Sequence, residues 1–106
     1  IDIKKALATT LEYGFGENDC LCHGNLGNTE ILMEYGKIFN DKMTLDLCTS
    51  IRGEACNRIL EANYDSGRSY LYGYQIPGFM TGLSGMGYSL LRDINKELPC
   101  ILSLEI

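Results

Sequence analysis

Apolar positions recur every three to four residues in the first part of the chain. Ile3, Leu7 and Leu11 follow Asp2 at this spacing, which is the spacing of one face of an α-helix. The pattern predicts an amphipathic helix that begins after Asp2 and ends at about Tyr13.

The same spacing predicts three further helices, at about residues 28–39, 43–62 and 83–94. Asn40 and Asp41 predict the end of one helix followed at once by the cap of the next. Because the turn between them is very short, the second and third helices should be antiparallel neighbours. We expect their apolar stripes to face the core: Ile31, Leu32, Tyr35, Ile38 and Phe39 in one, and Met43 or Leu45, Leu47, Cys48, Ile51, Ala55, Ile59 and Leu60 in the other.

Two segments between the helices are not helical in pattern. Residues 14–28 hold four of the twelve glycines and three asparagines, which is typical of a long loop. Three tyrosines alternate over residues 70–74, which suits a short strand or an extended loop, and we expect this stretch to be mostly irregular. After Pro99 we expect a short extended C-terminal tail. The fold class predicted from these patterns is all-α with long Gly-rich loops.

Composition restricts the class of protein further. A chain of 106 residues with 45% hydrophobic and 22% charged residues is suited to one folded domain. A net charge of −5, with the basic residues scattered, argues against a nucleic-acid or anionic-membrane partner. No apolar run approaches the roughly 20 residues of a transmembrane helix, so a soluble protein is expected. The odd number of cysteines, five, favours reduced thiols and a cytoplasmic location.

A repeat connects two distant parts of the sequence. Gly24-x-x-Gly27 and Gly82-x-x-Gly85 each open a predicted helix, and they are offset by 58 residues, about the length of one helical hairpin. Repeats of this size indicate arrays of hairpins that bury their apolar faces against their neighbours. Because two copies are too few to close such an array, we expect further hairpins upstream. A chance coincidence in a glycine-rich chain is the alternative.

One pair of adjacent residues carries candidate metal chemistry. Cys22 and His23, the one histidine of the chain, lie in the glycine-rich loop, and Cys20 lies two residues before them. A thiolate and an imidazole are favoured zinc ligands. The alternative is a loop histidine beside a partly buried thiol. A catalytic Cys–His nucleophile is less plausible, because side chains of neighbouring residues diverge and no second histidine exists to act as the base.

The remaining charged residues indicate no catalytic site. Glu30, Glu34, Glu54 and Glu61 fall on predicted helices, where we expect them on solvated faces. Arg52 and Arg58 are expected at the surface or in ion pairs. No pair of carboxylates stands out as an acid and base couple.

Two motifs resemble those of a known family. Residues 21–28, Leu-Cys-His-Gly-Asn-Leu-Gly-Asn, resemble the C-H-G motif of the lanthionine synthetase cyclases. Residues 77–92, of the form P-G-x-M-T-G-L-x-G-x-G-Y-x-L-L-R, are similar to the stretch near the C-terminus of these enzymes, above all the bifunctional class II (LanM type) synthetases. The order and separation of the two motifs also agree, so the resemblance covers nearly all of residues 11–106.

The resemblance implies an α/α toroid of helical hairpins, of which residues 1–106 would be an arc: the C-terminal fragment of a LanC-like cyclase domain. It also implies a Zn2+ ion held by two cysteines and one histidine. Cys22 and His23 match the adjacent ligand pair, whereas the third ligand belongs to a W-C-x-G type motif that would lie upstream. Cys20 could substitute geometrically, although the family pattern does not require it. The family's acid and base residues are also expected upstream, so the catalytic residues are unknown.

The implied activity is lanthipeptide biosynthesis. In it the thiolate of a peptide cysteine adds to dehydroalanine or dehydrobutyrine in a dehydrated precursor peptide, giving a (methyl)lanthionine thioether. The fragment alone is expected to be inactive. The runner-up is a non-catalytic helical-repeat module that binds a partner. A six-hairpin carbohydrate-active toroid is a poorer alternative, because it requires a pair of carboxylates facing a cavity.

Overall fold

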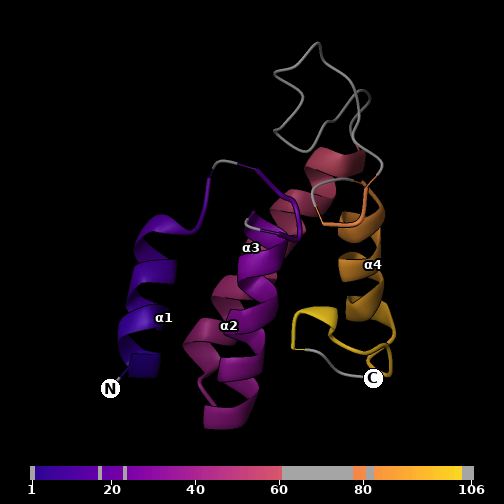
Figure 1. The fold of residues 1–106 in the computed structure, drawn as a ribbon. Helices are drawn as coiled ribbons and strands as arrows, with labels where there is room; N and C mark the ends of the chain where they lie inside the picture. The colour runs from indigo at the N-terminus through magenta and orange to yellow at the C-terminus, as the bar shows by residue number, and fades with distance from the viewer. Residues whose placement is uncertain (1, 17, 23, 61–77, 81–82, 104–106) are drawn as a thin grey trace.

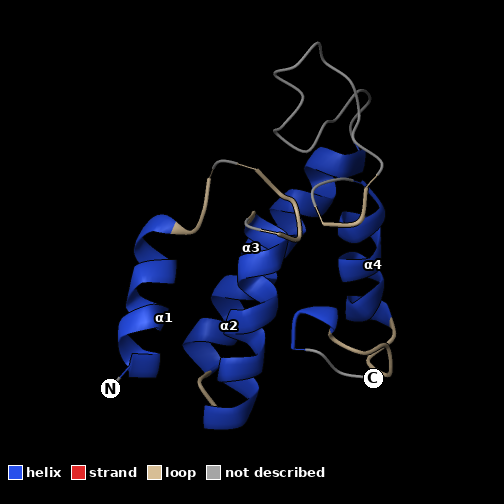
Figure 2. Ribbon diagram, viewed as in Figure 1, coloured by secondary structure: helices blue, strands red, loops and turns tan. Residues whose placement is uncertain are grey.

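The computed structural model describes residues 2–16, 18–22, 24–60, 78–80 and 83–103. Helices make up its regular structure (Figures 1 and 2): α1 Asp2–Tyr13, α2 Asn25–Phe39, α3 Lys42–Leu60, α4 Leu83–Ile94 and a short 3-10 helix, η1, Ile101–Ser103. These described residues contain no strand, so the all-α prediction is confirmed for them. The alternating tyrosines of residues 70–74 lie outside the described residues.

The predicted hairpin of the second and third helices is confirmed, since α2 and α3 pack against each other along their length. Asn40 ends α2 in the left-handed conformation, with φ 53°, and its N–H donates to the carbonyl of Gly36. The Asp41 carboxylate then accepts hydrogen bonds from the backbone N–H of Thr44 at 3.2 Å and from its hydroxyl at 2.9 Å. Such a side-chain cap satisfies a donor that a helix N-terminus leaves without an intrahelical partner.

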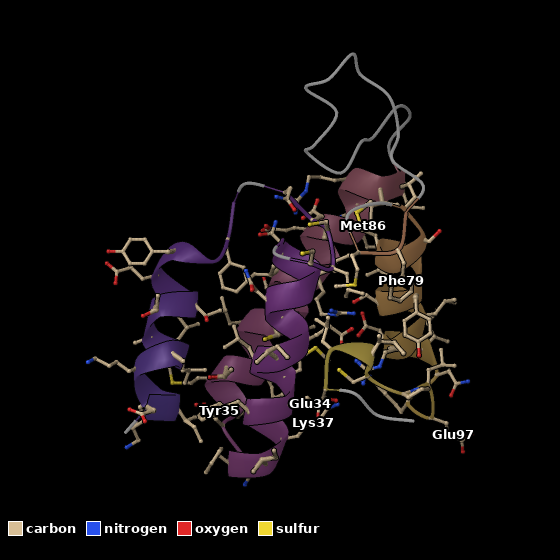
Figure 3. The ribbon with its side chains drawn as sticks, viewed as in Figure 1. Glu34, Tyr35, Lys37, Phe79, Met86 and Glu97 are labelled. Atoms are coloured by element: carbon tan, nitrogen blue, oxygen red, sulfur yellow. The ribbon has the colours of Figure 1, made fainter. Side chains whose placement is uncertain are left out.

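The apolar core lies at the end of the molecule where α2 and α4 begin and α3 ends. Leu26 of α2, Ala55 of α3 and Met86 of α4 are fully buried there, with Ile59, Leu83 and Leu90 packed against them. Figure 3 shows Met86 at this end of α4. The core therefore lies directly behind the loop that precedes α2.

The buried faces of α2 and α3 differ from the expected apolar stripes. Leu32 and Cys48 are buried as predicted, but Ile31, Ile38 and Phe39 are exposed. On α3 Leu47 and Leu60 are also exposed, and of the two alternatives Met43 and Leu45 it is Leu45 that is half-buried, while Thr44 and Arg52 are buried. The prediction was wrong at these positions because the buried face of each helix includes polar groups that find partners on other helices.

The predicted extended tail is wrong for the residues that form η1. Side chains of α4 fix the segment before it: the Tyr88 hydroxyl donates to the carbonyl of Pro99 at 2.6 Å, and Arg92 Nε donates to the carbonyl of Leu98 at 3.1 Å. These bonds fold the segment back along α4 and towards α2 (Figure 1). Hydrogen bonds from α4 therefore hold the segment before η1 in place.

α1 contains no buried residue, and Figure 1 shows it beside the α2–α3 hairpin. None of the helices in the described residues has the length and apolar character needed to cross a membrane. The arrangement of the hairpins as an arc of a toroid stays a prediction.

Candidate functional site

Two loops at the core end of the molecule have the same local structure. A Cβ atom at Gly27 would overlap the backbone carbonyl of Leu21, and a Cβ atom at Gly85 would overlap that of Phe79. Gly27 and Gly85 are 58 residues apart, and so are Leu21 and Phe79. The first residues of α2 and α4 have the same separation. The repeat predicted from the G-x-x-G motifs is thus seen in the structure at Gly27 and Gly85. Gly82 lies outside the described residues.

The two loops are joined by a backbone hydrogen bond. The N–H of Cys22 donates to the carbonyl of Met80 at 2.7 Å. Met80 is itself 58 residues after Cys22, so the bond links corresponding positions of the two copies. Phe79, beside Met80, is 36% exposed, and its ring lies 5.7 Å from that of Tyr88 (Figure 3). The second loop therefore supports the first directly at Cys22.

Backbone contacts within the first loop fix the neighbours of Cys22. The Asn18 side-chain oxygen accepts from the N–H of Cys20 at 3.0 Å, and the carbonyl of Cys20 accepts from the N–H of Gly24 at 3.0 Å. At Gly24 a side chain would overlap Asn18 and Cys20, so the closeness of these contacts requires glycine. The result is a compact turn that holds Cys22 in place.

The two cysteines of this loop have different environments. Cys22 is exposed and its thiol is free. His23 lies outside the described residues, so its predicted role as a ligand is untested. Cys20 is fully buried, so it does not share the exposed position of Cys22, and the structure gives no support for its use as the third ligand. The chemistry of the exposed Cys22 thiol fits a soft divalent metal.

The other described thiols and carboxylates do not form a metal site. Among the described residues, no three His, Cys, Asp or Glu side chains gather into a group that could hold a metal ion. The five cysteines form no disulfide: Cys48 and Cys100 are buried and Cys56 is half-buried. The predicted core position of Cys48 is confirmed.

An ion pair with a buried carboxylate joins the loop that carries Cys22 to α3. Both oxygens of Asp19 accept from Arg58 of α3, with Nε to Oδ2 at 2.8 Å and Nη2 to Oδ1 at 2.7 Å. The amide of Asn25, the first residue of α2, also donates to Asp19 Oδ1 at 2.6 Å. Arg58 was expected at the surface or in an ion pair, and it is both paired and 40% exposed, whereas Asp19 was not predicted as its partner. Its position in a Gly- and Asn-rich loop, three residues before Cys22, was the available signal.

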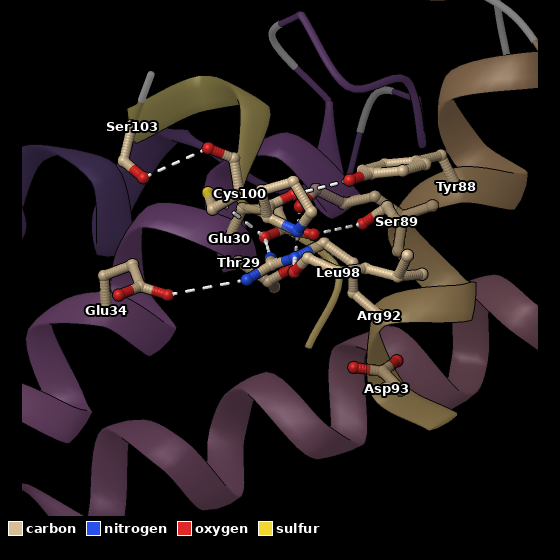
Figure 4. Close-up of polar contacts among 12 residues, drawn as sticks. Thr29, Glu30, Glu34, Tyr88, Ser89, Arg92, Asp93, Leu98, Cys100 and Ser103 are labelled. Carbon is tan, nitrogen blue, oxygen red and sulfur yellow. Dashed lines mark hydrogen bonds and ion pairs between the residues drawn. The ribbon is translucent and has the colours of Figure 1, made fainter. Parts of the chain in front are cut away.

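A second charged cluster joins α2, α3 and α4 (Figure 4). Glu30 is buried and accepts from Arg92 Nη1 and from the Ser89 hydroxyl, the latter at 2.7 Å. Arg52, also buried, donates through Nε to both oxygens of Asp93 at 3.1 and 3.0 Å, and its Nη2 lies 3.7 Å from Glu30 Oε1. The expectation of a solvated Glu30 was therefore wrong. A buried carboxylate requires such partners, and the helix packing supplies them.

The other acidic residues vary in exposure. Glu54 is exposed as predicted. Glu34 is half-buried, 3.4 Å from Lys37 Nζ and 3.7 Å from Arg92 Nη2. Glu61 lies outside the described residues. Glu30 and Asp93 are each bound to arginines, so neither is assigned a role as a catalytic acid or base.

Burial also changes the chemistry of one thiol in the α2–α3 hairpin. Desolvation by burial raises the pKa of Cys48 from 9.0 to about 11, although the positive charge of the nearby Arg52 acts to lower it. The thiol is therefore protonated near neutral pH. Together with its burial, this makes Cys48 a core residue and not a reactive one.

Comparison with known proteins identifies the class to which these loops belong. The model of the family described as lanthionine synthetase C-like protein matches residues 1–106. The chain therefore belongs to the lanthionine synthetase C-like (LanC-like) family, as its C-H-G and P-G-x-M-T-G motifs predicted.

A particular relative narrows the resemblance. The chain is 31% identical to the Lacticin 481/lactococcin biosynthesis protein LcnDR2 of Lactococcus lactis subsp. lactis over 107 aligned positions, which cover 92% of the chain and 11% of that protein. The chain thus spans about a ninth of the length of this relative. The match supports the predicted likeness to a LanC-like segment of a class II, LanM-type synthetase. No solved structure gives a significant match.

Proposed function

We propose that residues 1–106 form the C-terminal part of a LanC-like cyclase domain in a lanthionine synthetase, with Cys22 and His23 as two protein ligands of a zinc ion. Family membership and the biosynthetic role named for LcnDR2 support a place in lanthipeptide biosynthesis. The observation that carries the proposal is the exposed, free thiol of Cys22 on a loop fixed by a hydrogen bond to Met80. The substrate would be a dehydrated precursor peptide, met in the cytoplasm.

In this proposal the chain's own residues bind the zinc ion and fix its position. Cys22 is the donor whose backbone is fixed from both loops, and His23 follows it in the chain. Zinc held there would lower the pKa of a peptide cysteine thiol, so that its thiolate forms near neutral pH. In the reaction the sulfur forms a bond to the β-carbon of dehydroalanine or dehydrobutyrine, and the α-carbon takes up a proton. None of the described residues is assigned to deliver that proton.

Metal analysis of the intact protein tests the ligand assignment. The wild type should contain about one zinc per chain, and Cys22→Ala or His23→Ala should lose most of it, because each removes a coordinating atom. Cys56→Ala is the matched control, since Cys56 lies on α3 and is half-buried. It should retain zinc. Tight stoichiometric zinc that survives Cys22→Ala would refute the assignment.

Ring formation can be measured in the same variants. Addition of a thiol to a dehydro residue leaves the peptide mass unchanged, so alkylation of the remaining free thiols followed by mass spectrometry counts the rings. Cys22→Ala and His23→Ala should leave the thiols of a dehydrated peptide free, whereas Cys56→Ala should consume them as the wild type does.

The alternative function is a non-catalytic helical module that binds a partner protein. It is favoured by the apolar surface of α1, where Ile3 and Tyr13 are 61% and 73% exposed. A groove of about 550 Å³ between α3 and α4, lined in part by Cys56 and Ile94, is a second candidate surface for a partner. This function predicts that His23→Ala has no effect on the activity of the intact protein, which separates it from the zinc proposal.

A further inference from the structure

The strongest unassigned feature is the ion pair beneath the Cys22 loop. The Asp19 side chain is 2% exposed, whereas that of Arg58 is 40% exposed. Arg58 reaches the carboxylate from α3, which is 39 residues away in the sequence. Asn25 reaches it from the start of α2. One carboxylate thus ties together the loop, the beginning of α2 and the end of α3.

The pairing of Asp19 with Arg58 restricts the position of the loop backbone. A buried carboxylate is costly unless it is paired and hydrogen-bonded, and two parallel bonds from one guanidinium also fix its orientation. Asp19 therefore keeps its partners only while the backbone at residue 19 stays where the structure places it. Arg58 gains a further constraint from its position near the end of α3, whose neighbours Ala55 and Ile59 pack in the core.

Two contacts restrain the loop at Cys22. Three residues before it, the Asp19 carboxylate is paired with Arg58, and the N–H of Cys22 itself donates to the carbonyl of Met80. Only two residues separate Asp19 from Cys22. A shift of Asp19 is accordingly passed to Cys22 through a very short stretch of backbone.

We propose that Asp19 and Arg58 are positioning residues for the metal site, which hold the Cys22 loop in the geometry that Cys22 and His23 need to share one zinc ion. The inference rests on the proposed function for the identity of the metal. Asp19 and Arg58 touch neither substrate nor metal in this proposal. They act by fixing the backbone before Cys22.

Substitution of the pair in the intact protein tests the inference. Asp19→Asn keeps the shape of the side chain but removes the charge that Arg58 pairs with, and Arg58→Gln removes the partner. Each should weaken zinc binding by about 10- to 100-fold, measured by competition with a chromophoric chelator, as is typical when residues that orient metal ligands are lost. The double variant should be no weaker than either single variant, because both changes break the same contact.

Two further variants distinguish a loss of positioning at the metal site from a general effect on folding. Asp93→Asn makes the same chemical change in the ion pair with Arg52, near the C-terminal end of α4. It should lower the thermal unfolding temperature but leave zinc affinity unchanged. Arg58→Lys keeps the positive charge without the two parallel bonds, so its zinc affinity should fall between those of the wild type and Arg58→Gln.

A second readout does not depend on the metal. In the metal-free intact protein, the rate at which Cys22 is alkylated, followed by peptide mass mapping, should change about threefold or more in Asp19→Asn and not in Asp93→Asn. Folded Asp19→Asn protein with wild-type zinc affinity would overturn the inference, as would an equal loss of affinity in Asp93→Asn. If the wild type holds no zinc at Cys22 and His23, the proposed function fails, and an unchanged alkylation rate then overturns the positioning role as well.

Discussion

Single residues in this chain differ most in how much water and charge surround them. Cys20 and Cys22 are two positions apart, yet one is fully buried and the other exposed. The thiol of Cys48 is buried beside Arg52 and has a pKa of about 11. These differences decide which thiols are available for chemistry and which belong to the core.

The raised pKa of Cys48 predicts a pH dependence of stability. Below pH 9 the thiol is protonated in the folded and the unfolded state. Between pH 9 and about 11 it ionises in the unfolded chain but stays protonated in the fold. The unfolded state then binds fewer protons, so the free energy of unfolding falls as pH rises, by about 2 to 3 kcal/mol in total.

Urea unfolding at pH 8 and pH 10.5 under reducing conditions, compared with Cys48→Ala, measures this contribution. The wild type should lose more stability than the variant over that interval, because alanine has no thiol to ionise. Equal losses in the two proteins would show that Cys48 does not titrate as described.

At the scale of elements, local sequence signals were sufficient for the positions of the helices. The predicted beginning after Asp2 and end at about Tyr13 match α1, and the break at Asn40 and Asp41 matches the α2–α3 turn. α2 begins at Asn25, three residues before the predicted start, because the glycine-rich loop is shorter than its composition suggested. Capping and periodicity act over a few residues, so they can be read without the tertiary fold.

Gly27 of α2 and Gly53 of α3 have opposite predicted responses to alanine. A side chain at Gly27 would overlap the carbonyl of Leu21, whereas nothing lies within 4 Å of a Cβ atom at Gly53. Gly27→Ala should lower the free energy of unfolding by about 1 to 3 kcal/mol, since the backbone beside Cys22 must move. Gly53→Ala should raise it by about 1 kcal/mol through helix propensity alone.

Chemical denaturation of the two variants provides the measurement. Because both change glycine to alanine in an α-helix, the difference between them isolates the close contact of the loop with α2. A stabilising Gly27→Ala would mean that the loop does not lie against α2 as described.

At the scale of the whole molecule, charged side chains connect elements that are far apart in the sequence. Glu30 of α2 is joined to Arg92 of α4, 62 residues away, and Arg52 of α3 is joined to Asp93, 41 residues away. The thiol of Cys100 lies 3.6 Å from Glu30, which brings the end of the chain to the same cluster (Figure 4). The cluster therefore links α2, α3, α4 and the segment before η1.

Glu30→Gln should be among the more destabilising changes in this region. It removes the buried charge that pairs with the largely buried Arg92 and lies 3.7 Å from the buried Arg52, so the free energy of unfolding should fall by about 3 kcal/mol. The exposed Glu54 on α3 is the matched control, and Glu54→Gln should change stability by no more than about 0.5 kcal/mol. Denaturant unfolding of both variants decides the point, and a loss below that of Glu54→Gln would refute the role of the cluster.

The sequence by itself determined the helices, the hairpin turn, the 58-residue repeat and the family, because each depends on residues close together or on a motif of fixed spacing. Only the tertiary structure decided that Glu30, Arg52 and Asp19 are buried, and that Met80 holds Cys22. The charged partners of Glu30, Arg52 and Asp19 lie 22 to 62 residues away in the sequence. Whether a charge can be buried depends on such partners, and helical packing alone brings them together.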